Sequence, residues 1–184
     1  ARRNPYPAFT TSTMQIESSR KLGLSASQTM CTAQRLYEGT DIKGETTGLI
    51  TYMRTDSVVM SKEAINQVRG FVTDNYGANY LPDAPRVYKS KAKNAQEAHE
   101  CIRPTNIYLT PKDIKQYITL EEYKLYEIIW QRAVSSQMAS AVLDQVAVDI
   151  TNEDKKIVLR ANGSTIKFPG MYKVYQEAKD DDKD

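Results

Sequence analysis

The spacing of apolar residues divides the sequence into a long helical part and a shorter β-rich part. Up to about residue 141, apolar side chains return every three or four positions, which is the period of amphipathic helices. Beyond that point Val146, Val148 and Ile150 alternate with other residues, which is the period of a strand. The pattern predicts an α+β protein with a mainly helical domain at 1–141, antiparallel β-strands at 142–176 and an acidic tail at 177–184.

Capping residues mark where the helices begin and end. The first two predicted helices are separated only by a short turn that contains a glycine, which is the outline of a helix-turn-helix. Asn94 and Glu97 form a capping box for a short helix that must stop near Arg103, because Pro104 follows. The five predicted helices span 14–22, 28–38, 61–76, 94–103 and 119–134.

Composition excludes several classes of protein. The 184 residues include 40% hydrophobic and 26% charged side chains, which is enough apolar surface for a packed core. No run of eighteen apolar residues and no signal-peptide pattern is present, so we expect a cytoplasmic protein without a membrane span. His99 is the single histidine, and Cys31 and Cys101 stand far apart, so we expect no zinc site from these residue types and two structural thiols.

Two further patterns match ligand sites only loosely. Residues 39–46 have the glycine spacing of a phosphate loop, but Glu45 stands where that motif has its lysine, so we reject nucleotide binding. Asp180, Asp182 and Asp184 have the spacing of a magnesium-binding cluster. They lie in a polar tail with nothing to hold their geometry, and we interpret them as solvated.

Charge is distributed unevenly although the totals nearly cancel. The sequence has 25 Lys+Arg and 23 Asp+Glu, a net charge of +2. Residues 1–35 hold five basic groups and one acid. Such clusters bind phosphate backbones through counterion release, and a neighbouring aromatic ring stacks on unpaired bases, although a solvated loop has the same pattern. A second basic segment contains Arg86, Lys89, Lys91 and Lys93, with Tyr88 among them.

Tyr52 is the strongest candidate for chemistry. It lies in Gly48–Thr55, whose β-branched and aromatic residues predict a strand, and a strand would put Arg54 on the same face as Tyr52. A phenol, with an ordinary pKa of about 10, is a weak nucleophile at neutral pH. A guanidinium beside it favours the phenolate and stabilises charge on an attacked phosphate, so the pair suits attack on a phosphodiester. The alternatives are that Tyr52 only packs and that Arg54 pairs with Asp56 or another acid.

His99 and Arg103 form a second candidate pair. They lie one helical turn apart in the predicted short helix and would share one face of it. Both side chains donate hydrogen bonds that suit backbone phosphates, and a histidine can also transfer a proton. The alternative is that His99 is an ordinary surface residue.

Four segments, which occur along the chain in the same order as in the family, resemble the motifs of type IA DNA topoisomerases, and specifically of bacterial topoisomerase I. Gly48–Ser57 (GLITYMRTDS) resembles the active-site segment of that family and is the most specific of the four. Ala95–Thr105 resembles its second signature, and Pro7–Gln15 with Ala33–Glu38 resembles its upstream helical pair. The resemblance covers roughly residues 7–138.

The resemblance implies a winged-helix-like cleavage domain followed by part of the β-rich arch that links the domains of such an enzyme. The tyrosine that matches Tyr52 attacks a phosphate of single-stranded DNA and leaves a 5′-phosphotyrosine and a free 3′-hydroxyl. Reversal after strand passage relaxes negatively supercoiled DNA without ATP. The resemblance also assigns transition-state stabilisation to Arg54, and DNA contacts or pocket organisation to Thr55, Asp56, His99 and Arg103.

The sequence also departs from the family pattern. The acidic Asp-x-Asp-x-Glu cluster that holds Mg²⁺ in the family is not found here, so the resemblance implies Mg²⁺ only for a longer parent enzyme and no cofactor for this chain. We expect the chain alone to bind single-stranded DNA weakly, without relaxing supercoils, and to self-associate through faces that the remaining domains cover. The resemblance implies that the enzyme acts in the bacterial cytoplasm, at the nucleoid. It also implies that Lys89, Lys91 and Lys93 lie near the path of the DNA.

Two other classes of DNA-binding protein share part of this pattern. A non-catalytic helix-turn-helix module would use the first two helices in the major groove and would prefer duplex DNA. A tyrosine recombinase also forms a phosphotyrosine, but it places its nucleophile after a His-x-x-Arg pair. Here Tyr52 precedes His99, and the spacing is His-x-x-x-Arg, so the order disfavours this class.

Overall fold

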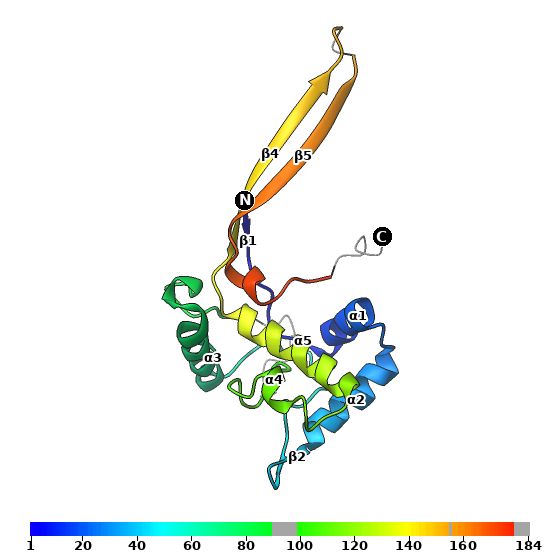
Figure 1. Cartoon of the computed structure of the whole chain (residues 1–184), viewed down its shortest axis with the longest axis vertical. Coiled ribbons are helices and arrows are strands. Elements are labelled where there is room, and N and C mark those ends of the chain that lie inside the picture. The colour runs from blue at the N-terminus through cyan, green and yellow to red at the C-terminus, as the bar shows by residue number, and fades with distance from the viewer. Residues whose placement is uncertain (90–98, 155, 179–184) are drawn as a thin grey trace.

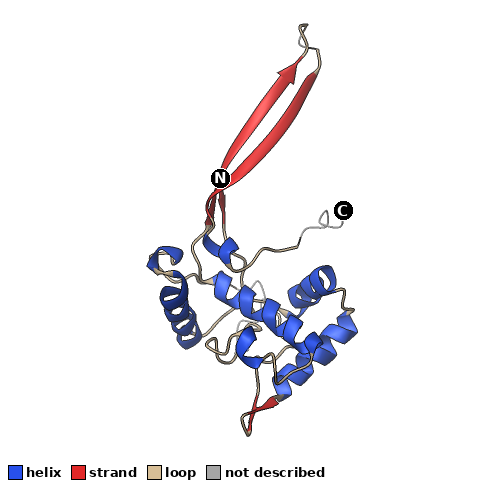
Figure 2. Ribbon diagram, in the orientation of Figure 1, coloured by secondary structure: helices blue, strands red, loops and turns tan. Residues whose placement is uncertain are grey.

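A computed structural model describes residues 1–89, 99–154 and 156–178. It has a helical body from which a long two-stranded arm projects (Figure 1). Colouring by secondary structure separates the two parts clearly, since the long strands lie in the arm and the helices lie in the body and at the base of the arm (Figure 2). The predicted α+β class is therefore confirmed.

The first two helices form the predicted pair. Helix α1 (Thr11–Leu22) begins three residues earlier than the sequence suggested, because the N-cap is Thr10, whose hydroxyl accepts a hydrogen bond from the Thr13 N–H. Gly23 ends α1 with a left-handed φ of 68°, a conformation that costs little only for glycine. Helix α2 (Ala26–Glu38) follows after a turn and begins with its own capping box.

Helix α5 (Leu120–Ser136) is the central element of the body. It contacts α1, α2, α3 (Lys62–Tyr76) and α4 (Pro111–Ile114), and most of its side chains beyond the first turn are buried. Two of its aromatic residues satisfy their polar atoms while they fill the core. The Trp130 indole donates to the Ile107 carbonyl at 2.9 Å, and the Tyr126 hydroxyl donates to the Leu109 carbonyl at 2.6 Å.

A small hairpin projects from the body after α2. Strands β2 (Thr40–Ile42) and β3 (Glu45–Thr47) pair around Lys43 and Gly44, which have φ values of 56° and 91°. Positive φ at both residues of a two-residue loop is the geometry of a type I′ turn. The glycine spacing rejected above as a phosphate loop thus belongs to a hairpin, an element that the sequence analysis did not predict.

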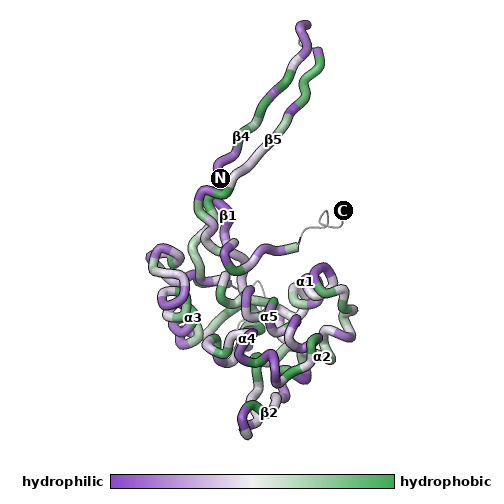
Figure 3. The backbone as a smooth tube through the Cα atoms, viewed as in Figure 1, coloured by the Kyte–Doolittle hydropathy of each residue, from purple (hydrophilic) through white to green (hydrophobic). Residues whose placement is uncertain are grey.

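The arm consists of β4 (Ala141–Thr151) and β5 (Val158–Phe168), and its base is joined by the short strand β1 (Arg2–Arg3). The sequence predicted antiparallel strands here but shorter ones, at 146–150, 157–159 and 165–168. Apolar and polar residues alternate along the arm (Figure 3), yet both of its faces are exposed. The short helical turns η1 (Ala78–Tyr80) and η2 (Gly170–Lys173) complete the described elements.

Two predicted elements are wrong. The segment 48–55 is extended but forms no strand ladder, and its one bridge joins Ile50 to Pro104, which has no N–H to donate. Residues 99–103 are also extended, because the N–H groups of Cys101 and Ile102 donate to Val59 and Phe9 and are not used in a helix. The remainder of the short helix predicted at 94–103 lies outside the described residues.

Candidate active site

Three chain segments that are far apart in sequence meet at the segment that carries Tyr52. The segment 101–105 lies between the others: the Ile102 N–H donates to the Phe9 carbonyl at 2.8 Å, and the Thr105 N–H donates to the Leu49 carbonyl at 3.1 Å. Phe9, Ile50 and Ile102 are almost fully buried below this layer. The packed core therefore supports the candidate site from beneath.

The segment that carries Tyr52 keeps a two-residue alternation although it is not a strand. Tyr52, Arg54 and Asp56 are exposed, whereas the residues between them are buried. Tyr52 is 44% exposed, so it is not a core residue. Arg54 makes no ion pair with Asp56 or with another acid in the described part of the chain. The phenol and the guanidinium are thus both exposed to solvent; that they share one face stays a prediction.

Tyr37 touches the ring of Tyr52, and the sequence analysis did not single it out. The two ring centroids are 5.4 Å apart with planes at 66°, an edge-to-face contact. Tyr37 lies in the last turn of α2 and is 41% exposed. Its contact restricts the Tyr52 ring from one side and leaves both aromatic surfaces open to solvent.

Thr51 fixes the backbone just before Tyr52. Its N–H donates to the Arg103 carbonyl at 2.9 Å, and its hydroxyl donates to the Cys101 carbonyl at 2.7 Å and accepts from the Arg103 N–H at 3.0 Å. The backbone on the N-terminal side of Tyr52 therefore cannot shift without breaking bonds to 101–103.

Thr55 is almost buried, with 9% of its surface exposed, and its hydroxyl accepts a hydrogen bond from the Ser57 N–H at 3.0 Å. This environment favours organisation of the loop over direct contact with a ligand. Asp56 beside it is exposed and available to one. The two polar neighbours of Arg54 that the sequence analysis grouped together thus have different surroundings.

Arg103 anchors the fold. Its guanidinium donates to the Glu100 carboxylate at 2.6 and 3.1 Å and to the Pro104 carbonyl at 3.0 Å. Burial acts to raise the pKa of Glu100, but hydrogen bonds from Ser61 and the charge of Arg103 outweigh it and lower the pKa. Because 99–103 is extended, the expected helical face shared by His99 and Arg103 is wrong. His99 itself is exposed.

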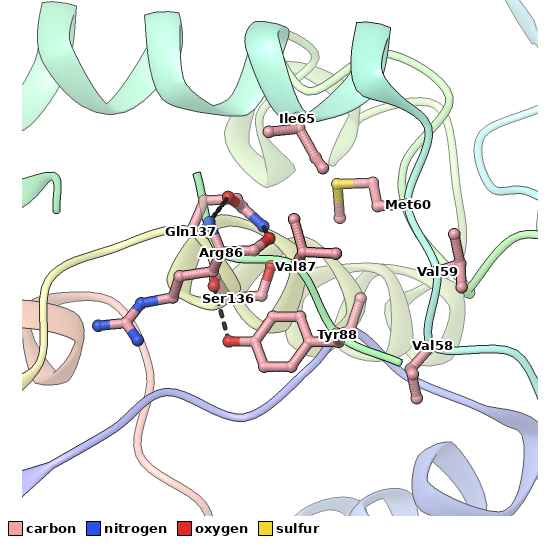
Figure 4. A pocket seen from close by; sticks show the side chains of 10 residues that line it. Val58, Val59, Met60, Ile65, Arg86, Val87, Tyr88, Ser136 and Gln137 are labelled. Carbon is pink, nitrogen blue, oxygen red and sulfur yellow. Dashed lines mark hydrogen bonds between the residues drawn. The ribbon is translucent and has the colours of Figure 1, made fainter. Parts of the chain in front are cut away.

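The basic segment after Asp83 is held to the body by its first residues (Figure 4). The side chain of Gln137 accepts from the Arg86 N–H at 3.1 Å and donates to the Arg86 carbonyl at 3.0 Å. The Tyr88 hydroxyl donates to the Ser136 carbonyl at 2.9 Å, and burial raises the pKa of Tyr88 to about 12. Tyr88 is therefore not free to stack on a base. Lys89 is exposed, and Lys91 and Lys93 lie outside the described residues.

The basic character of residues 1–35 is partly neutralised within the fold. Arg35 pairs with Glu121 at 3.1 Å and with Glu122 at 2.8 Å, and Lys21 pairs with Glu17 at 3.1 Å. Of the two cysteines, Cys31 is exposed, whereas burial raises the pKa of the Cys101 thiol to about 12. Only Cys101 therefore matches the expected structural thiol.

The described residues include no candidate metal site, and the cavity drawn in Figure 4 is small. No group of three or more His, Cys, Asp or Glu side chains that could hold a metal ion occurs in 1–89, 99–154 and 156–178. The cavity beside Val87 in Figure 4 has a volume of only about 20 Å³, enough for about one water molecule. Within the same ranges no helix has the length and apolar character needed to cross a membrane. Tyr52 does not line the cavity of Figure 4 and is exposed to solvent.

Comparison with known proteins shows the family of the chain. A family model described as DNA topoisomerase matches residues 1–184. The chain belongs to this family. DNA topoisomerase 1 of Rickettsia felis is 54% identical over 181 residues, which cover 98% of this chain and 23% of that protein. DNA topoisomerase 1 of Xylella fastidiosa is 49% identical over 180 residues, which cover 97% and 22%.

A solved structure has the same fold. Full-length topoisomerase I from Thermotoga maritima matches with a TM-score of 0.82 and 33% identity, over 97% of this chain and 30% of that one. The resemblance to bacterial type IA topoisomerases is therefore confirmed. This topoisomerase chain spans less than a third of the length of each of these relatives.

Proposed function

We propose that this chain carries the nucleophile of a type IA topoisomerase, and that the nucleophile is Tyr52. The phenol oxygen attacks a backbone phosphorus of single-stranded DNA, forms a 5′-phosphotyrosine and releases a 3′-hydroxyl, which takes up the proton. The reverse attack by that hydroxyl restores the strand, so the bond energy stays in the ester and no ATP is needed. The observation that carries the proposal is that Tyr52 is exposed, two positions before an exposed Arg54, on a segment whose backbone is hydrogen-bonded to 101–103.

The neighbouring residues have distinct proposed roles. Arg54 neutralises charge that develops on the attacked phosphate, a task for which a guanidinium with no partner in the described chain is suited. Asp56, His99 and Lys89 are exposed and are proposed to contact DNA. Thr55 and Arg103 act by holding the loop and its support. Lys91 and Lys93 remain proposed contacts on sequence grounds.

Relaxation of negatively supercoiled DNA is proposed for the whole enzyme. We propose, from the family resemblance, that a metal that supports cleavage is held by other domains of the whole enzyme. Those domains are the proposed partners, together with single-stranded DNA, in the bacterial cytoplasm at the nucleoid. Without them we expect copies of the chain to associate through exposed apolar residues, such as Val146 and Leu159 on the arm.

The cleavage role is tested by Tyr52→Phe in a full-length topoisomerase that carries this segment. With Mg²⁺ and a single-stranded oligonucleotide, the variant is expected to lose covalent complex formation and supercoil relaxation entirely, because it lacks the attacking oxygen. DNA affinity should stay within about twofold, since the ring and its contact with Tyr37 are kept. Relaxation by the variant would contradict the proposal, and so would relaxation by the isolated 184-residue chain.

The binding preference separates this proposal from a non-catalytic helix-turn-helix module. Gel shifts of the isolated chain are expected to favour single-stranded over duplex probes of equal length. Replacement of Lys89, Lys91 and Lys93 with Ala should lower the salt-dependence slope by up to about 2, at roughly 0.7 per phosphate contact on a single strand. A duplex preference would instead support the helix-turn-helix module, and an unchanged slope would remove the lysines from the DNA path.

A further inference from the structure

The backbone after Tyr52 is held by Thr11, the first residue of α1. The Thr11 N–H donates to the Thr55 carbonyl at 2.9 Å, and the Thr55 N–H donates back to the Thr11 hydroxyl at 2.9 Å. The same hydroxyl donates to the Met53 carbonyl at 2.7 Å, with a longer contact to the Thr55 carbonyl at 3.1 Å. One side chain thus binds the backbone on both sides of Arg54.

Thr51 bonds to 101–103 in the same pattern in which Thr11 bonds to 53–55. Its N–H donates to the Arg103 carbonyl, its hydroxyl accepts from the Arg103 N–H, and the same hydroxyl donates to the Cys101 carbonyl. The segment with Tyr52 and Arg54 is therefore fixed at its start through Thr51 and at its end by Thr11. Because this segment has no strand ladder, the two hydroxyls replace the hydrogen bonds that a sheet would supply. Arg54 itself is exposed, so its direction depends on the backbone that Thr11 holds.

We infer that Thr11 is a positioning residue for DNA cleavage: its hydroxyl holds the backbone at 53–55 so that Arg54 and Tyr52 meet the same phosphate. This inference rests on the proposed role of Tyr52. A misplacement of about 1 Å can cost roughly 100-fold in rate, so loss of the hydroxyl should act on the chemical step. DNA affinity should change little, because Thr11 is only partly exposed and contacts backbone atoms.

The test compares three variants in a full-length topoisomerase that carries this segment. Thr11→Val keeps the shape of the side chain and should lower the single-turnover cleavage rate by about tenfold or more, with the dissociation constant for DNA within about twofold. Thr11→Ser keeps the hydroxyl and should restore the rate to within about threefold of wild type. Thr13→Val is the matched control, because it removes a hydroxyl from the same turn that bonds to Thr10 and not to the loop.

Several outcomes would overturn the inference: a wild-type rate in Thr11→Val, equal losses in Thr11→Val and Thr13→Val, or no recovery in Thr11→Ser. Tyr52→Phe is measured in parallel, because cleavage by that variant would refute the proposed function itself and not the role of Thr11.

A test without variants uses amide hydrogen exchange in the wild-type chain. The Thr55 amide, which donates to Thr11, should exchange more slowly than the Arg54 amide, which donates to no group in the described residues; equal rates would contradict the clamp.

Discussion

Arg103 is a cationic side chain close to the proposed active site, but its contacts stabilise the fold. Its guanidinium is engaged by Glu100 and by the Pro104 carbonyl, and Glu100 also accepts from the Ser61 N–H at 2.8 Å. One carboxylate thereby joins the start of α3 to the segment that supports Tyr52. We expect changes at Arg103 to affect stability before they affect DNA binding.

The Glu100 carboxylate should make stability depend on pH. Its pKa in the folded state lies below the ordinary value of 4.5, so its contribution is fully present above pH 4.5 and is lost as the pH falls through the lower folded value. Glu100→Gln should reduce the free energy of unfolding at pH 7 by about 1 kcal/mol, after allowance for partial exposure. Urea unfolding should show this difference shrink towards pH 3, whereas Glu153→Gln at the exposed tip of the arm should change little. A difference that is constant with pH would be contrary to this assignment.

At the residue scale, the sequence singled out the residues proposed for the chemistry but missed those that contact and hold them. Tyr52, Arg54 and Asp56 were recognised from a single motif, and all three are exposed. Tyr37 and Thr11 were missed because their roles depend on contacts with residues 15 and more than 40 positions away. Threonine at the start of a helix is an ordinary capping signal, and nothing in the local sequence shows that its hydroxyl faces another segment.

At the scale of elements, local signals worked where the interactions are local. The helices at α1, α2, α3 and α5 were predicted because capping residues and the apolar period lie within each segment. The expected strand at 48–55 and the helical conformation expected at 99–103 were wrong because distant segments take their backbone hydrogen bonds. The β2–β3 hairpin was missed because Lys43 is an uncommon residue at positive φ.

Helix α5 also joins the two ends of the described chain through Arg132, which is 2% exposed. Its guanidinium donates to the Pro7 carbonyl at 2.7 Å and to the Glu177 carboxylate at 3.0 Å. The guanidinium carbon, Cζ, lies 4.9 Å from the centre of the Phe9 ring. The segments before α1 and after η2 are therefore both tied to the middle of the body.

Arg132→Ala should lower the free energy of unfolding by about 3 kcal/mol, because it removes a buried cation from its carbonyl and carboxylate partners. Urea denaturation followed by circular dichroism measures this loss. Arg160→Ala is the matched control, since the Arg160–Asp149 pair lies exposed on the arm and should contribute no measurable stability. Equal effects in the two variants would show that the Arg132 cluster does not hold the ends together.

At the scale of the whole molecule, the arm and the body have different requirements. The body has its own buried core, whereas the arm is a two-stranded ribbon that exposes apolar residues on both faces. An isolated ribbon of this kind is marginally stable in water, so its base depends on β1 and on the body. The chain spans about a quarter of the Rickettsia and Xylella relatives. We propose that the remaining domains of such a protein cover the exposed apolar residues of the arm.

The central claim is that Tyr52 forms a covalent bond with DNA. The most direct measurement is to trap the complex of a full-length topoisomerase carrying this segment with single-stranded DNA and Mg²⁺, digest it and map the nucleotide-bearing peptide by mass spectrometry. We predict a 5′-phosphate ester on Tyr52 and on no other tyrosine, and no adduct in Tyr52→Phe. An adduct on any other residue, or one that persists in Tyr52→Phe, would contradict the claim.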